Sequence, residues 1–501
     1  MLSQRVGILI IGVLATATFW LCRRYFQLRG IPGPFVARIT NLCRVRWVGS
    51  RKSHEIHSRL HDQYGSVVRF GPNMVSVADP AAISVIYPAR SGFLKGDFYH
   101  VFKSPDEPPD VFTAQDEGIH KTLRAPVAPY YSFSKLQSLE TAIDNNIDRL
   151  FHQLDRKDSG DSTSLTTWLQ AFAFDTVWAW MFTNPYGMLE MGSTEEKKTL
   201  ESNWEIFQII GPLSQSSTLR NLAGIINAIL TALKIDSIPQ LHKHTVSLIK
   251  SREEQFESSS EELNASDNVD MMTQLLLMKS KNSMIPPWTV SSLSLLNVFA
   301  GSDSTAVVMG TMWHNLLLHR DSMQCLYNEL LEHEAQGSLT RPVPKWKEVR
   351  GLAYLDACLN EALRLHPPFC LPFERVVPDT GLSIGDYYLP PGTLVGMSPY
   401  VVGRYKPVFG QDADQWRPER WLECSPQDQR KMESSMITFG AGRRVCLGKN
   451  VAIMEIKKLI PAILLRYDIK LLDPTSFKVE NSWFFRQEGL DVEMKKRDGS
   501  A

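Results

Sequence analysis

The sequence predicts a mainly α-helical protein with small β-sheets. Helical periodicity dominates from about Ile119 to Leu331, in stretches such as TAIDNNIDRLFHQL and LTTWLQAFAFDTVWAWMF. Strand-like runs occur only before and after this region, and we find no internal repeat. The 501 residues have zero formal net charge, 43% hydrophobic residues and 22% charged residues. This is the composition of a globular protein, and it lacks the basic excess typical of nucleic-acid-binding proteins.

The chain begins with an apolar segment, Val6–Cys22, that contains no charged residue. At ~1.5 Å per residue a helix of this length reaches about 25 Å, enough for a thin bilayer. Three arginines follow within seven residues, against one before it, which places the rest of the chain in the cytosol. A cleaved signal peptide is the alternative, because Ala15–Ala17 resembles a cleavage site, but the apolar run continues past it. We therefore expect residues 1–30 to be a membrane anchor with a basic stop, and residues 31–501 a single domain.

Four further stretches predict the elements of this domain in order. SVVRFGPNMVSVAD, Ser66–Asp79, reads as a β-hairpin around a Gly-Pro-Asn turn. The polar and acidic stretch Glu253–Asp270 is expected to be a solvated loop between helices. Ser291–His319 reads as one long apolar helix, and short strands return in Gly381–Met397.

The cysteines and glycines exclude several functional classes. The seven cysteines are irregularly spaced and include no CxxC pair, so neither a disulfide framework nor a structural zinc site is expected. The sequence has no P-loop and no complete GxGxxG fingerprint. Redox chemistry by this protein would therefore need electrons from a partner.

One cysteine stands in an unusual setting, FGAGRRVCLG, at Phe439–Gly448. Gly440 and Gly442 permit positive φ and a close approach of the backbone to a flat ligand. The amphipathic stretch that follows predicts a helix, whose free N–H groups would favour the thiolate form of Cys446. Arg444 could neutralise an acidic substituent of a cofactor. Taken alone, Cys446 is either a buried inert residue or a thiolate ligand.

These ten residues fit F-x-x-G-x-R-x-C-x-G and resemble the haem-binding signature of cytochromes P-450. The resemblance implies the cytochrome P-450 fold and a haem b whose iron is axially ligated by the thiolate of Cys446, with Phe439 and Gly448 in the same cofactor-binding loop. It also implies that NADPH is used indirectly, through a separate NADPH–cytochrome P-450 reductase. Arg443, Lys449, Lys457 and Lys458 could help to dock that reductase, or they could simply form a solvated helix face.

Two further segments match the E-x-x-R pair of that family and its arginine partner. Glu361 and Arg364, in YLDACLNEALRLHPP, share a helix face, and Arg420 stands in RPERW. The resemblance gives these three residues a structural role, in which they hold the haem-side core. The family's phenylalanine at the end of the second segment is Trp421 here.

The middle of the long helix, AGSDST, resembles the oxygen-activation segment AGxDTT of the family. The resemblance implies that Asp303 feeds protons and that the neighbouring alcohol, Ser304 or Thr305, assists. Serine at the first alcohol position keeps the hydroxyl but lacks the methyl group that fixes the threonine rotamer. On residue pattern alone, a helix bend at a packing contact is slightly favoured over this role.

Cations for the haem propionates are predicted in three places. His120 and Arg124, in HKTLRAPVAPYYS, are four residues apart on one helix face and resemble the family's W/H-x-x-x-R helix. Arg375, in LPFERVVPD, corresponds to a family arginine that reaches a propionate. Arg444 is the fourth candidate, and contacts of this kind are strong when shielded from water.

Substrate contacts are expected from aromatic residues and one alanine, by resemblance to the loops and helices that surround the family's pocket. Their apolar character suits an apolar small-molecule substrate. They are Phe98, Phe102, Phe112, Phe299, Ala300, Phe369, Phe373, Trp483 and Phe484.

The overall pattern resembles fungal microsomal members, especially the pisatin-demethylase-like group, in FDTVWAWMFTNPYGMLE and NSWFFRQEGL. The prediction is a haem-thiolate monooxygenase of secondary-metabolite biosynthesis. It would be anchored by one N-terminal helix in the endoplasmic reticulum membrane, in contact with lipid, with its catalytic domain in the cytosol. It would insert one oxygen atom of O2 into its substrate. The alternatives are a haem-thiolate isomerase or dehydratase without external electrons, and a non-enzymatic haem-binding protein.

Overall fold

The computed structural model describes residue 12 and residues 22–89, 93–102, 108–157, 161–190, 195–232, 240–263 and 270–497. The predicted anchor, residues 6–22, lies outside these ranges apart from Gly12 and Cys22. Within the ranges that are described, no helix is both long enough and apolar enough to cross a membrane.

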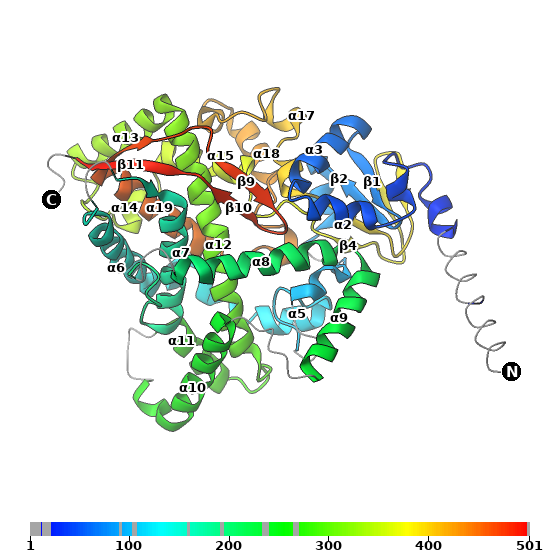
Figure 1. Cartoon of the computed structure of the whole chain (residues 1–501), viewed down its shortest axis with the longest axis horizontal. Coiled ribbons are helices and arrows are strands. Elements are labelled where there is room, and N and C mark those ends of the chain that lie inside the picture. Colours follow the sequence, from blue (N-terminus) through cyan, green and yellow to red (C-terminus); the bar gives the residue numbers. More distant parts are fainter. Residues whose placement is uncertain are drawn as a thin grey trace.

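A single long helix, α12 (Thr289–Leu318), runs through the middle of the molecule (Figure 1). It is apolar on all sides because it packs against α7 (Leu165–Phe182), α15 (Ala353–Leu365) and α19 (Lys449–Arg466). The prediction of one helix at residues 291–319 is confirmed.

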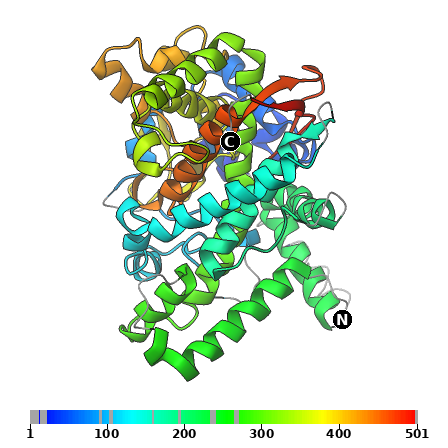
Figure 2. The same ribbon diagram turned by 90° about the vertical axis from the view of Figure 1, so that its left-hand side faces the viewer.

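Helices α10, α11 and α13 also contact α12. Helices α10 and α11 occupy the lower part of the molecule in both views, away from the sheets (Figures 1 and 2). The remaining α-helices of eight or more residues are α2 (Leu42–Gly49), α3 (Ser53–Tyr64), α5 (Glu117–Arg124), α6 (Gln137–Leu154), α8 (Glu195–Ser214), α9 (Ser217–Ala232), α10 (Gln240–Leu263), α11 (Met271–Ser280), α13 (Arg320–Ala335) and α18 (Pro426–Ser434).

The strands form small sheets at the edges of the helical body. The predicted hairpin is confirmed, since β1 and β2 pair antiparallel with Val67 opposite Val77, and β7 extends this sheet beside β2. The sheets are β1–β2–β7–β4, β3–β11–β8, β9–β10 and β5–β6. The strands are β1 (Val67–Gly71), β2 (Met74–Val77), β3 (Thr163–Ser164), β4 (Arg375–Val376), β5 (Leu382–Ile384), β6 (Tyr387–Leu389), β7 (Leu394–Gly396), β8 (Tyr467–Leu471), β9 (Lys478–Asn481), β10 (Phe485–Glu488) and β11 (Asp491–Lys496).

The prediction of a loop at residues 253–270 is wrong for its first half. Helix α10 continues to Leu263, and Phe256 is buried against the main core. Glutamate, glutamine and leucine are good helix formers, so a polar composition here indicates an exposed helix face as readily as a loop.

Candidate functional site

The loop that carries Cys446 is closed on itself and lies against the segment that follows α4 (Ile83–Ile86). The backbone N–H of Cys446 donates to the carbonyl oxygen of Phe439 at 2.7 Å. Gly440 and Gly442 adopt φ of +73° and +62°, as the sequence predicted. A Cβ on Gly442 would overlap the carbonyl oxygen of Tyr87, so only glycine fits there.

The thiol of Cys446 opens onto internal space three residues before α19 begins. Its side chain has accessible surface, yet burial among surrounding protein atoms raises the pKa of the thiol above its ordinary value. A thiol on the wall of an internal cavity has both properties, since it has accessible surface and is still surrounded by protein atoms. The N–H groups of Gly448 and Lys449 and the positive charge of Arg124 oppose this rise in the pKa. Since burial prevails, a stable thiolate here needs a cation bound directly to the sulfur.

A buried lysine that the sequence analysis missed lies near the predicted propionate ligands. Lys95 is 4% exposed, donates to the carbonyl oxygen of Phe112, and lies 4.2 Å from the ring centroid of Tyr99. Burial first, and then the charges of Arg375 and Arg444, hold the pKa of Lys95 well below its usual range. No family motif marked this residue, and a lysine within the aromatic stretch FLKGDFY was the one available signal.

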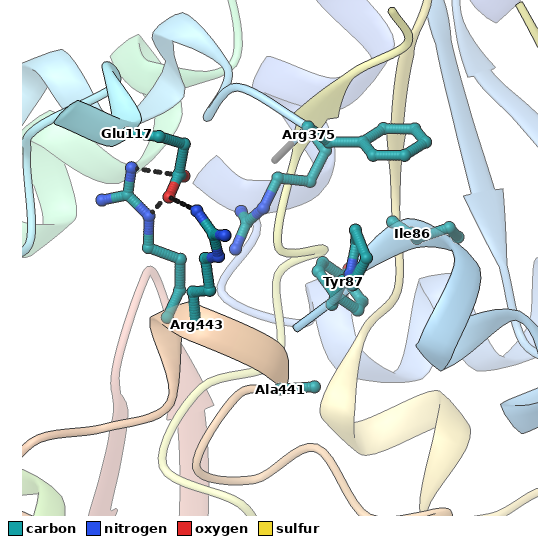
Figure 3. A pocket seen from close by; sticks show the side chains of 9 residues that line it. Ile86, Tyr87, Glu117, Arg375, Ala441 and Arg443 are labelled. Carbon is teal, nitrogen blue, oxygen red and sulfur yellow. Dashed lines mark hydrogen bonds and ion pairs between the residues drawn. The ribbon is translucent and has the colours of Figure 1, made fainter. Parts of the chain in front are cut away.

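Three of the four predicted propionate ligands converge on the same region, where Arg444 already has a carboxylate partner. The Arg444 guanidinium donates from Nε to Glu117 at 2.9 Å and to the carbonyl oxygen of Ala114 at 2.7 Å. Figure 3 shows Glu117 facing the two adjacent arginines, with Arg375 reaching toward the same point. These residues line one small pocket, together with Ile86, Tyr87 and Ala441. Arg375 donates to the hydroxyl of Tyr99 at 3.2 Å.

Helix α5 supplies two more groups to this region, the imidazole ring of His120 and the guanidinium of Arg124. His120 is 3% exposed, and its Nε2 has no hydrogen-bond partner among the described residues. Burial and the charge of Arg444 lower its pKa to about 3, so the ring is neutral and able to donate or accept. Burial also lowers the pKa of Arg124, a shift that the proximity of Cys446 opposes. This excess of buried positive charge calls for an anion, and the two propionates of a haem beside Cys446 fit it.

The predicted oxygen-activation segment of α12 places its two alcohols in different surroundings. Ala300 is exposed although it lies in the middle of the central helix, which again indicates a cavity. Ser304 Oγ donates to the carbonyl oxygen of Ala300 at 2.7 Å, whereas Thr305 is 2% exposed. Asp303 accepts a hydrogen bond from Gln170 at 2.6 Å, and burial raises its pKa. The structure therefore places Ser304, and not Thr305, on the side of the cavity.

The three residues predicted to be structural form one buried network. Glu361 accepts two hydrogen bonds from Arg364, at 2.7 and 2.8 Å, and one from Arg420 at 3.0 Å. The backbone N–H of Arg417 adds another. The departure from the family pattern has a function in the fold, because the indole N–H of Trp421 also donates to Glu361, at 3.0 Å. Sequence reasoning missed this donor.

Comparison with known proteins agrees with this geometry. The family model described as cytochrome P450 matches residues 32–491. The chain belongs to the cytochrome P450 family. It is 46% identical to cytochrome P450 monooxygenase pkfB of Emericella nidulans, over 98% of this chain and 96% of that protein. It is 43% identical to cytochrome P450 monooxygenase asR2 of Sarocladium schorii, over 95% of this chain and 94% of that protein.

A third relative, cytochrome P450 monooxygenase mpaDE of Penicillium roqueforti, is 45% identical over 98% of this chain. The chain spans 58% of the length of that relative. The family assignment makes this chain a cytochrome P450 monooxygenase, a class that binds haem through a cysteine thiolate.

Most of the predicted substrate residues of this cytochrome P450 lie in one aromatic cluster around Trp483. The ring centroid of Trp483 lies 4.3 Å from the ring centroids of Phe98 and Phe102 and 5.6 Å from that of Phe369. The other predicted members are Phe112 and Phe484. Phe373 packs instead against the core of the β1–β2–β7–β4 sheet, with its ring centroid 6.2 Å from that of Phe369.

Several residues that the sequence did not indicate also belong to this cluster, two of them from α12 and α8. Val307 contributes from α12, and Phe207 of α8 lies 5.0 Å from Phe484. In contrast, Phe299 packs against the main helical core, 6.0 Å from His242, and does not join the cluster.

The expected basic docking patch is wrong for two of its lysines. Lys457 and Lys458 are 1% and 0% exposed, so they belong neither to a docking surface nor to a solvated face. They pair with Asp356 at 2.6 Å and with Glu140 at 2.9 Å. These carboxylates come from other helices, and the sequence of α19 alone could not indicate them.

Proposed function

We propose that this cytochrome P450 inserts one oxygen atom of O2 into an apolar small molecule, with Cys446 as the axial ligand of its haem iron. The observation that carries the proposal is the closed loop of Cys446 beside an excess of buried cations. The haem supplies oxygen activation when it is bound. Lys95, Arg124, Arg375 and His120 would hold its propionates.

The remaining residues orient the reactants and control protons. Ser304 presents its hydroxyl on the cavity side of α12, and the buried carboxyl of Asp303 holds a proton more readily than an exposed one. The aromatic cluster around Trp483 offers an apolar wall that excludes water and favours apolar substrates.

The electron source, biological setting and location are also proposals. Electrons would come from NADPH through NADPH–cytochrome P-450 reductase, because the sequence has no nucleotide-binding fingerprint. The fungal sources of the relatives, together with the resemblance to the pisatin-demethylase-like group, support a role in secondary-metabolite biosynthesis.

Association with the endoplasmic reticulum membrane has independent support from exposed apolar side chains. They cluster in two segments, the N-terminal part of the body and helices α8 and α9, and α8 packs against α2. Single exposed apolar residues are common, whereas groups of them mark interaction surfaces. These residues are Phe26, Phe35, Val36, Ile39, Leu42, Ile209, Leu222, Ile225 and Ile226. Flotation of the full chain with phospholipid vesicles tests this proposal, and a chain that stays at the bottom of the gradient would contradict it.

The central proposal is tested by the carbon monoxide difference spectrum of the reduced protein. Wild type and a Cys424→Ala control should show the strongly red-shifted band of a thiolate-ligated haem, and Cys446→Ala should lack it. A haem-loaded wild type without this band would exclude Cys446 as a stable thiolate ligand. Product formation that requires NADPH and reductase then distinguishes a monooxygenase from an isomerase.

A further inference from the structure

Asp303 is held by a residue that no motif indicated. The side-chain amide of Gln170, on α7, donates to Oδ1 of Asp303 at 2.6 Å. Among the described residues, this is the one hydrogen bond that the carboxyl group accepts from another side chain. Helix α7 packs along α12, so the partner approaches Asp303 from outside the central helix.

The chemistry of an amide suits a carboxyl group that gains and loses a proton. The NH2 group of Gln170 donates to the carboxylate. After the side-chain amide rotates by about 180°, its carbonyl oxygen can accept a hydrogen bond from the protonated acid. Arginine or lysine would favour only the charged form, because neither has an acceptor. Gln170 can therefore keep Asp303 in place in both protonation states.

Polar side chains continue from this pair along the contact between α12 and β10. The side chain of Gln487 donates to Thr311 Oγ1 at 2.7 Å. A Cβ on Gly310 would overlap the side-chain oxygen of Gln487, so β10 lies directly on α12. Thr166, four residues before Gln170 on α7, also borders Gly310. We call this region, between α7, α12 and β10, the polar seam.

The β10 side of the polar seam ends at an ion pair near the protein surface, because Arg486 is the neighbour of Gln487 on β10. Arg486 of β10 pairs with Glu488 at 2.6 Å, and their side chains are 29% and 56% exposed. Burial raises the pKa of Asp303, while the Gln170 hydrogen bond and the charge of Arg486 lower it. Gln170 of α7 and Arg486 of β10 thus act on Asp303 from the two elements that pack against this side of α12.

We propose that Gln170 is a positioning residue for Asp303 and that protons reach Asp303 from solvent through the polar seam. The inference rests on the proposed monooxygenase function. That reaction converts substrate, O2, NADPH and one proton into hydroxylated substrate, water and NADP+. NADPH supplies both electrons through the reductase. Each proton that Asp303 gives toward the cavity is replaced from solvent past Gln170 and Arg486.

The test compares Gln170→Leu and Gln170→Glu with the control Thr167→Val, which removes an α7 hydroxyl that donates to Ser164. Holoprotein with an intact carbon monoxide band is titrated by infrared spectroscopy, and the Asp303 carboxyl band is assigned by difference from Asp303→Asn. Gln170→Leu should raise the pKa of Asp303, because it removes a hydrogen bond to the charged form. Thr167→Val should leave this pKa unchanged.

The second readout is NADPH oxidation with reductase and no added organic substrate, in H2O and D2O. Gln170→Leu should slow NADPH oxidation by about tenfold and increase the solvent isotope effect. The loss of rate should be smaller than the factor of about 10²–10⁴ that a proton-transfer group itself contributes. Gln170→Glu, which can exchange protons, should recover part of the rate.

The outcomes separate this inference from the proposed function. If Gln170→Leu leaves both the infrared pKa and the isotope effect unchanged, the positioning role is wrong. If Gln170→Leu does not load haem, Gln170→Glu decides, and a Glu variant with the wild-type pKa of Asp303 overturns the inference. A haem-loaded wild type without the red-shifted band would contradict the proposed function. Infrared titration of that same protein would still report on the Gln170–Asp303 contact.

Discussion

Replacing Trp421 by phenylalanine removes one hydrogen bond from a buried carboxylate while keeping an aromatic ring. Glu361 is 0% exposed, and the indole N–H is one of five donors around it. A hydrogen bond to a charged group contributes about 1.5–3 kcal/mol, and Arg364 still serves the same oxygen in the variant. We therefore expect a loss of about 2 kcal/mol. Over 501 residues the entropy of unfolding is about 1 kcal/mol/K, so the unfolding midpoint should fall by about 2 °C.

The matched control is Trp416→Phe. Trp416 is also buried, but its indole donates to the neutral hydroxyl of Ser322, at 3.3 Å, a bond whose net contribution is about 0.5–1.5 kcal/mol. Both variants are haem-loaded and heated while circular dichroism and the haem absorbance are recorded together. Should Trp421→Phe unfold no lower than Trp416→Phe, the indole bond to Glu361 contributes no more than a hydrogen bond to a neutral group, and the reasoning from the charged network is wrong.

Three further outcomes follow from the same structure. Lys95→Met keeps the apolar stem but removes the charge, and it should weaken haem binding about tenfold. The haem-to-protein ratio measured at limiting haem tests this, and an unchanged ratio would place Lys95 away from the propionates. Gly442→Ala should lose most haem-loaded protein, because its Cβ overlaps the carbonyl oxygen of Tyr87, whereas Gly351→Ala, with open space around it, should not. Burial lowers the pKa of His57 from 6.5 to about 3. The neutral ring therefore stabilises the folded state fully above pH 6.5. This free energy of stabilisation is lost at about 1.4 kcal/mol per pH unit as the pH falls toward 3. His57→Phe should flatten the decline of the urea midpoint between pH 6.5 and 5, and an equally steep decline would count against His57 as its source.

The elements predicted with most success were those with a strong local pattern. The hairpin at residues 66–79 and the long helix at 291–319 are both present, because β-branched residues around a Gly-Pro-Asn turn and a long apolar run are local signals. The acidic stretch that begins at Glu253 was misjudged, because charged helix formers leave the choice between helix and loop to the packing of Phe256.

The sequence by itself determined the family and the loop that presents Cys446, since ten contiguous residues carry both the glycine conformations and the thiol. The tertiary structure alone decided which side chains complete the site. Gln170 and Asp303 are 133 residues apart, and Lys458 meets a carboxylate 318 residues away. Hydrogen bonds and ion pairs act over about 3–4 Å in space, whatever the separation along the chain, so these partners became visible only when the helices were packed.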